Sequence, residues 1–302
     1  MGTSSWHFPG WAGLVWGGDY AESKLSKSGL AAYAKHPLFG TVSLDRAFYR
    51  PLSASQYAQY AAQVPENFRF MVKAPSLVAD ALVRTENGRG TASNPAFLSH
   101  ELAVSHFVEP ALEGLGAKVG ALVFQISPMP RQLLDRVPEV INRIGLMLAA
   151  LPALRPIAPD GVIAVEVRDA AFLSAQNAPL LARMLLDVRA TNPTTYCLGL
   201  HARMPAIEDQ LPLLRALWPG PLVCRWNLHR RHGKYGYEEA RRTYEPFDRL
   251  VDPDPETRAV LARVAMATAG AGHPVYIAIN NKAEGSAPLS IGALAKAMET
   301  LL

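Results

Sequence analysis

The sequence predicts a single (β/α)8 barrel, a TIM barrel with extended rim loops, over residues 1–302. Three observations lead to this prediction. Short β-rich runs alternate with longer helical patterns, eight such runs can be counted, and polar residues gather at their C-terminal ends. The length suits this fold, because such barrels typically have ~250 residues and grow with insertions. A doubly wound open sheet uses the same alternation and stays the competing fold.

Taken in order, the eight runs are the expected strands. They span residues 2–5, 41–44, 68–73, 121–126, 162–168, 194–198, 222–226 and 274–280. Between them, apolar residues recur at helical spacing, as in Leu133, Val137, Ile141 and Ile144. Seven helical connections and a last helix over 291–301 complete the count that a (β/α)8 barrel requires.

The side-chain parity within the runs supports closure into a barrel. Successive strand residues face opposite sides of a sheet. In GVIAVEVRD, the apolar Ile163, Val165 and Val167 share the face that helices would cover, and Glu166 and Arg168 share the other. Most other runs repeat this split, so polar groups are expected to meet at the C-terminal rim of the barrel, where these folds bind ligands.

Three long connections separate the expected elements. Residues 6–19 are aromatic and glycine-rich, residues 83–95 are polar and expected to be mobile, and residues 227–244 are rich in charge. The segment 225–242 holds six Lys or Arg against two acids, an excess of four positive charges that equals the net charge of +4 of the whole chain.

Composition excludes several classes of protein. Apolar types make up 49% and charged types 19% of the chain, which excludes a disordered or fibrous protein. Cys197 and Cys224 lie in apolar runs and are expected to be buried free thiols. No signal peptide is evident, and the longest apolar run, 144–154, is too short to span a bilayer. We expect a cytoplasmic protein without a membrane partner.

Two residues are the candidates for catalysis. Glu166 would be a general base, and the guanidinium of Arg168 would bind a carboxylate or phosphate through two hydrogen bonds. Alternatively, the two residues form a structural ion pair. Lys73, at the end of the third run, would bind an anion or act as a nucleophilic amine, unless it is a rim lysine in a salt bridge.

Further polar and aromatic residues are candidates for substrate binding. Loops after strands seven and eight commonly bind phosphate in these barrels, which makes a phosphate- or carboxylate-bearing small molecule the expected partner. The aromatic segment would either stack on a ligand or form a hydrophobic plug. The candidates besides Arg168 are Arg225, Asn227, His229, Gln125, Asn280, Asn281, Trp6 and Tyr49.

No metal or cofactor is predicted. Asp45, Glu166, His201 and His229 would lie on one rim, but the sequence has neither an H-E-x-x-H motif nor a paired cysteine motif.

Long stretches of the chain resemble the DUF72 or YecE-like family. The resemblance rests on GTSSWHFPGWAG, FYRPLSASQYAQYAAQVPENFRFMVKAP, GALVFQISP, AVEVRDAAF and VYIAINNKAEGSAP, and it runs nearly end to end. It implies a TIM barrel with a pocket at its rim and no established reaction. The chain departs from the family pattern near this pocket, with Ser43, Asp80 and Asp169 among the replaced positions.

Three functions stay open at this point. The first is an enzyme or ligand-binding protein for a small polar, anionic or carbohydrate-like substrate at the barrel rim. The second is nucleic-acid binding or processing through the basic 225–242 segment. The third is a non-catalytic ligand sensor, which the replaced family positions favour.

Overall fold

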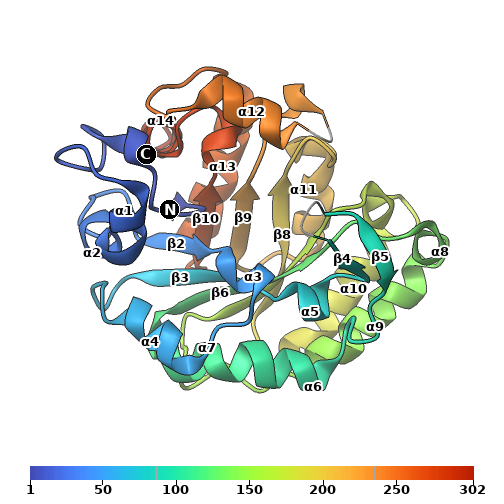
Figure 1. The fold of residues 1–302 in the computed structure, drawn as a ribbon. Coiled ribbons are helices and arrows are strands. Elements are labelled where there is room, and N and C mark those ends of the chain that lie inside the picture. The colour runs from blue at the N-terminus through green and yellow to red at the C-terminus, as the bar shows by residue number, and fades with distance from the viewer. Residues whose placement is uncertain (86–87, 234–235) are drawn as a thin grey trace.

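A computed structural model describes residues 1–85, 88–233 and 236–302. Its central feature is a closed barrel of eight parallel strands in the order β1-β10-β9-β8-β7-β6-β3-β2, which confirms the predicted (β/α)8 fold and excludes the open sheet (Figure 1). The strands are β1 (Gly2–Thr3), β2 (Thr41–Leu44), β3 (Arg69–Lys73), β6 (Val119–Ile126), β7 (Val162–Val167), β8 (Thr194–Leu200), β9 (Leu222–Trp226) and β10 (Val275–Ile279).

Helices lie between the strands along the chain and surround the barrel (Figure 1). The longer ones are α1 (Glu22–Ser28), α4 (Ala54–Ala61), α7 (Glu109–Leu115), α9 (Val137–Ala149), α10 (Ala178–Asp187), α11 (Ile207–Ala216), α12 (Tyr237–Tyr244), α13 (Pro255–Gly270) and α14 (Ala287–Glu299). Short helices are α2 (Leu30–Tyr33), α3 (Arg46–Tyr49), α5 (Ser76–Ala79), α6 (His100–Ala103) and α8 (Arg131–Leu134). None of the helices in the described ranges is long and apolar enough to cross a bilayer.

Local sequence explains where these helices begin and what they bury. Ser53 caps α4, and its hydroxyl accepts from the backbone N–H of Gln56 while the Gln56 side chain accepts from the backbone N–H of Ser53. In α9, residues at helical spacing such as Val137, Val140 and Ile144 are buried, so this helix covers the barrel with one apolar stripe.

The barrel interior is apolar in its middle and polar toward the C-terminal strand ends. A separate buried cluster fills the middle and consists of Met71, Ala121, Val123, Val162, Ala164, Cys197, Val223, Tyr276 and Ala278. Nearer the C-terminal end, strand pairing sets Gln125 beside Glu166 and Gly199 beside Arg225. The helix-facing Ile163 and Val165 belong to the other core cluster, as the alternation predicts. Polar groups therefore form the top layer of the barrel interior.

The polar connection 83–95, which the sequence predicts to be a long mobile connection, holds regular structure that the eight predicted strands do not include. It contains an antiparallel hairpin of β4 (Leu82–Arg84) and β5 (Gly90–Ser93), while residues 86–87 lie outside the described ranges. An ion pair of 2.6 Å between Arg84 Nε and Asp80 Oδ2 fixes the base of the hairpin. The exposed strand β5 has no alternation of apolar residues, so the sequence carries no signal for it.

Candidate functional site

Arg225 is the centre of a buried charge network at the C-terminal end of the barrel. It lies on β9 and is 1% exposed. Its Nη1 donates to Glu166 Oε2 at 2.6 Å and to Gln125 Oε1 at 3.0 Å, and its Nη2 donates to the two carboxylate oxygens of Asp45 at 2.8 and 2.9 Å. The guanidinium thus joins side chains from or next to strands β2, β6 and β7.

Glu166, the predicted general base, is held between two arginines. Its Oε1 lies 2.7 Å from Arg168 Nε, its Oε2 bonds Arg225, and none of the residue is exposed. A side chain on the neighbouring Gly199 would place its Cβ 3.3 Å from the carboxylate, so glycine makes room for it. Burial alone would raise the pKa of Glu166, but Arg168 and Arg225 outweigh it and lower the pKa. A carboxylate kept ionised in this way is a weak base.

Asp45 is the second carboxylate of the network. It follows β2 directly, and the Ser43 hydroxyl donates to its Oδ1 at 2.7 Å. Burial opposes its charge, but the positive charges of Arg225 and Lys73 prevail and lower the pKa of Asp45. Asp45 therefore compensates part of the charge of Arg225.

Lys73 ends β3 and is 9% exposed. Its Nζ lies 3.4 Å from the centroid of the Phe48 ring, a cation–π contact. Burial and the repulsion from Arg225 lower its pKa to about 7, although Asp45 partly offsets them. The neutral amine of Lys73 is therefore accessible near neutral pH.

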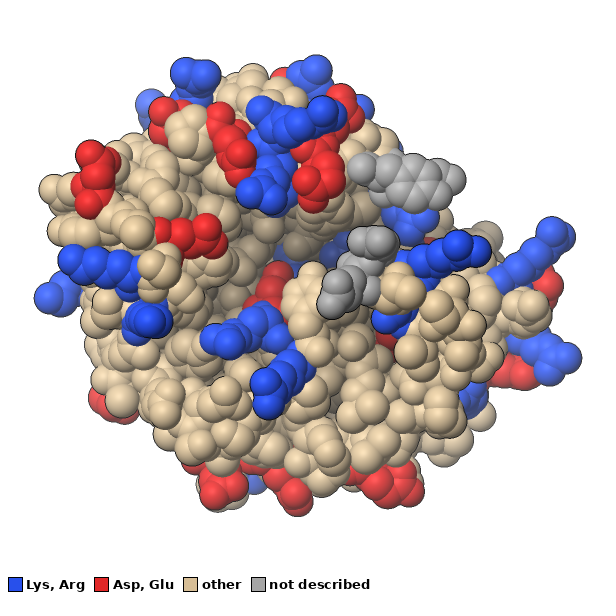
Figure 2. All heavy atoms as spheres, viewed as in Figure 1, with Lys and Arg blue, Asp and Glu red and all other residues tan. Residues whose placement is uncertain are grey.

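These groups surround a cavity of about 490 Å³. Figure 2 shows a hollow near the middle of one face, with charged side chains set back inside it. Seven of the predicted residues line the cavity: Tyr49, Lys73, Gln125, Arg168, Arg225, Asn227 and Asn280. Strand ends bring them together, as the parity of the runs indicates.

Four predicted residues do not line this cavity. Glu166 is fully buried in the charge network. Asn281 Oδ1 instead accepts from the Trp11 indole N–H at 3.2 Å and from the backbone N–H of Ala287 at 2.8 Å. His229 Nδ1 accepts from a backbone N–H at 3.2 Å as the cap of a short helix. Trp6 borders a neighbouring cavity.

The cavity also has lining residues that the sequence reasoning did not select. They are Asp45, Pro128, His201, Arg203, Tyr237 and Lys282. From the sequence, Asp45 and His201 are expected on this rim but are not selected for substrate binding, and Lys282 could have been found from its position beside the last strand. Tyr237 could not, because it begins α12 and does not lie at a strand end; its hydroxyl accepts a hydrogen bond from Arg168. Burial and the charge of Arg168 lower the pKa of His201 to about 3, so its ring is neutral.

Positive charge exceeds negative charge around the cavity. Apart from Arg203, whose charge interacts with Asp169, four cationic side chains face two carboxylates. The cations are Lys73, Arg168, Arg225 and Lys282, and the carboxylates are Asp45 and Glu166. Within the described ranges, these six side chains have a formal excess of two positive charges when Lys73 is charged and of one when its amine is neutral, and Glu238 and Glu245 also act on Lys282.

The replaced family positions have structural partners. Ser43 donates to Asp45, and Asp80 pairs with Arg84 at the base of the hairpin. Asp169 Oδ2 accepts from the backbone N–H of Met129 at 2.9 Å, and burial raises the pKa of this carboxyl.

In the basic segment 225–242, three of the five described arginines have acidic partners, and residues 234–235 lie outside the described ranges. Arg231 pairs with Asp252, and Arg241 Nε lies 2.7 Å from Glu245 Oε1. Figure 2 shows red and blue side chains interleaved on the face it draws, without a continuous basic stripe. Arg225 itself points into the buried network.

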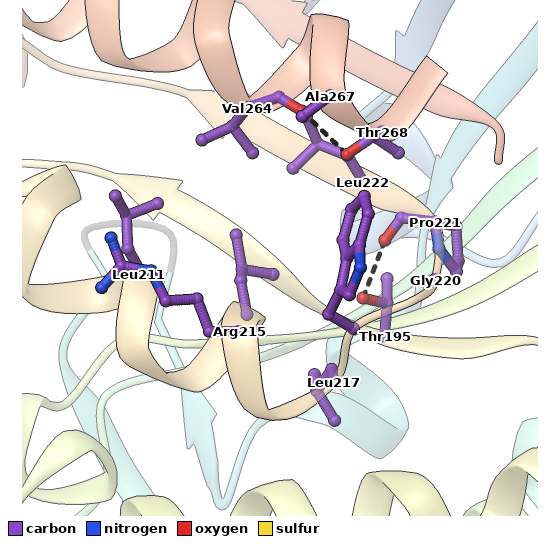
Figure 3. A pocket seen from close by; sticks show the side chains of 12 residues that line it. Thr195, Leu211, Arg215, Leu217, Gly220, Pro221, Leu222, Val264, Ala267 and Thr268 are labelled. Carbon is purple, nitrogen blue, oxygen red and sulfur yellow. Dashed lines mark hydrogen bonds between the residues drawn. The ribbon is translucent and has the colours of Figure 1, made fainter. Parts of the chain in front are cut away.

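Another hollow lies between α11 and α13, near the N-terminal ends of the strands (Figure 3). Its walls are mostly apolar, and the hydroxyls of Thr195 and Thr268 donate to backbone carbonyls at 3.0 and 2.8 Å. Unlike the cavity at the C-terminal end, this hollow has no convergent polar groups among its described lining residues. Within the described ranges, no three His, Cys, Asp or Glu side chains are grouped as in a metal site.

Comparisons with known proteins identify the family. A model of the family "Protein of unknown function DUF72" matches residues 1–301. A crystal structure of a DUF72 family protein from Enterococcus faecalis is similar over 99% of this chain and 94% of its own, with 16% identity and a TM-score of 0.59. Another from Thermotoga maritima has 16% identity and a TM-score of 0.56 over 99% and 98% of the chains.

These structural likenesses carry the fold only. The comparison with curated proteins finds no match. Because the family model spans residues 1–301, this chain belongs to the DUF72 family of proteins of unknown function.

Proposed function

We propose that this protein binds a small anionic molecule, carrying a phosphate or carboxylate, in the cavity at the C-terminal end of its barrel. The excess of positive charge around that cavity is the observation that carries the proposal. A buried cation needs a counter-charge, because the loss of hydration is costly. Asp45 and Glu166 supply only part of it.

The lowered pKa of Lys73 supports the same proposal. Burial and Arg225 weaken the hold of this amine on its proton in the unliganded protein, because both lower its pKa. An anion beside Lys73 would favour its charged form and restore a pKa nearer the ordinary lysine range. Anion binding is therefore coupled to proton uptake at Lys73.

We further propose an enzymatic role in which Lys73 exchanges a proton with the bound molecule. A base works best with a pKa near the working pH, and that of Lys73 is about 7. The contacts of Glu166 with Arg168 and Arg225 favour a different role for this carboxylate, as a positioning residue that orients the two guanidinium groups. A protein that binds the anion without turnover would instead be a ligand sensor.

Calorimetric titration of the full chain with inorganic phosphate tests the anion site. Lys282→Met should weaken binding by about tenfold, or ~1.4 kcal/mol, because it removes one lining cation. Lys296→Met is the matched control, since Lys296 is exposed on α14 and lines no part of this cavity. Absence of phosphate binding, or equal losses in both variants, would contradict the proposal.

The nucleic-acid alternative predicts different behaviour. Binding through 225–242 should depend on the exposed Arg230 and Arg242 and fall steeply with salt. Retention of a DNA or RNA oligomer at physiological salt, lost on Arg230→Ala together with Arg242→Ala, would favour that alternative over the small anion.

A further inference from the structure

A second cavity of about 230 Å³ adjoins the anion cavity. Asp45 and Tyr49 line both, so the two hollows share a wall. The second cavity is bordered by residues that follow β1, by the end of β2 and by side chains of α1, α3 and α4. A ligand that occupied both hollows would pass Asp45 and Tyr49.

The lining of the second cavity differs chemically from that of the first. Four serines contribute to its walls: Ser4, Ser5, Ser26 and Ser43. Lys and Arg are represented in its lining only by Arg46, whose Nη1 donates to the Tyr60 hydroxyl at 3.2 Å. The cavity thus offers hydroxyl groups and one carboxylate, that of Asp45, rather than a cationic surface.

Ser4 is the residue that points most directly to a ligand. It is 6% exposed, it lines the cavity, and its Oγ has no hydrogen-bond partner in the described part of the chain. A buried hydroxyl without a partner destabilises the fold, so natural proteins rarely keep one without a reason. A polar group of a bound molecule would satisfy it.

Aromatic rings form the remaining walls. The Trp6 indole N–H is already used, because it donates to the Leu25 carbonyl at 3.1 Å, so Trp6 offers the cavity its carbon surface. The Tyr60 ring meets Trp6 edge-on, with centroids 5.7 Å apart. Tyr49, at the junction of the two cavities, is 82% exposed, a high value for a large aromatic residue.

We propose that the ligand is a polyhydroxylated ring of the sugar type that carries one phosphate or carboxylate group. This assignment rests on the anion site proposed above. The anionic group occupies the cavity of Lys73, Arg168 and Arg225. The ring occupies the second cavity, where its hydroxyl groups bond Ser4 and Asp45 and its C–H face lies against Tyr49. The serine hydroxyls can bond the hydroxyl groups of such a ring, and the aromatic side chains can pack against its C–H face. A planar nucleobase in this cavity would leave the serine hydroxyls unpaired.

Comparative calorimetry tests this assignment. The probes are inorganic phosphate, glucose 6-phosphate, fructose 6-phosphate, ribose 5-phosphate and adenosine 5′-monophosphate, titrated into the full chain. At least one of the three sugar phosphates should bind tenfold or more tightly than inorganic phosphate and more tightly than adenosine monophosphate.

Variants then locate the gain in affinity. Ser4→Ala and Tyr49→Ala should each remove most of the advantage of the sugar phosphate. Ser4→Ala should leave the affinity for inorganic phosphate within twofold, because Ser4 does not line the anion cavity. Ser4→Ala should fold normally, because the hydroxyl it deletes has no partner. Tyr20→Ala is the matched control, since Tyr20 is a partly exposed tyrosine at another hollow.

The outcomes separate the two proposals. Phosphate binding with no sugar phosphate tenfold tighter, or a gain that survives both variants, would overturn the sugar assignment and leave the anion site standing. Tighter binding of adenosine monophosphate would also overturn it. Failure of every probe to bind would overturn the anion site, and the sugar assignment with it.

Discussion

Replacement of Glu166 by glutamine distinguishes the two roles considered for this carboxylate. Glu166→Gln keeps the size of the side chain but removes the charge that faces two guanidinium groups. If Glu166 holds Arg168 and Arg225 in place, the variant should lose stability. If Glu166 were a general base, the fold would be unaffected and only turnover would fall, by at least about a hundredfold.

The contact distances set the expected size of the loss. Glu166 oxygens lie 2.7 Å from Arg168 Nε and 2.6 Å from Arg225 Nη1. Two unit charges ~4 Å apart attract by about 4 kcal/mol at an effective dielectric constant of 20, and the desolvation of the buried carboxylate offsets part of this attraction. Removing one partner of a buried pair typically costs roughly 3–5 kcal/mol. We expect a loss in that range for Glu166→Gln at pH 7.

Urea unfolding at pH 7, followed by circular dichroism, measures this loss as a lower midpoint with an unchanged slope. Glu66→Gln is the matched control. Glu66 also forms an ion pair, with Lys118 at 3.0 Å, but its side chain is 92% exposed. That control should lose less than about 1 kcal/mol. Because the pKa of Glu166 is lowered in the folded state, this carboxylate stabilises the fold above its unfolded pKa of ~4.3, and the stabilisation is lost at lower pH. The difference in unfolding free energy between wild type and variant should therefore shrink below about pH 4. A variant as stable as wild type at pH 7 would refute the positioning role.

Three further predictions concern titration and reactivity. The affinity for sulfate, an anion that does not titrate between pH 6 and 9, should be constant below about pH 7 and fall above it, by up to tenfold per pH unit, because the pKa of Lys73 is about 7 without ligand and rises with it. Calorimetry from pH 6 to 9 measures this fall, which should vanish in Lys73→Met. His201 should show no imidazole titration between pH 5 and 8 by NMR, since burial and Arg168 lower its pKa to about 3, and a midpoint near 6.5 would contradict this. Cys197 and Cys224 should resist a thiol reagent until the protein unfolds, because burial raises both pKa values, and rapid labelling of the native protein would contradict it.

The sequence predicts the barrel well because its signals are local and repeated. Strands β2 and β9 have the predicted bounds, 41–44 and 222–226, and the alternation in 162–168 correctly assigns its two faces. The buried free thiols are confirmed as well. The β4–β5 hairpin was missed, because its exposed residues show no periodic burial that a pattern could reveal.

Some features of the candidate site could likewise be predicted from the sequence, and others depend on the tertiary structure. Sequence by itself determines which side chains face the barrel, since strand parity follows from the covalent geometry of an extended chain. Lys73, Gln125 and Arg225 could therefore be chosen without coordinates. Only the closed tertiary structure decides that Arg225 bonds Asp45, 180 residues away, and that Tyr237 reaches the cavity.

Charge states belong wholly to the tertiary structure. Whether Glu166 is a base or a fixed counter-ion depends on the balance of burial against the two arginines, and that balance depends on distances that the strand order does not contain. The same holds for Lys73, whose lowered pKa results from burial beside Arg225. Sequence determined the fold and the end of the barrel that carries the polar groups, because both depend on neighbouring residues along a strand. Tertiary structure decided which of these groups are charged and which face the cavity, because electrostatic energies depend on separations through space.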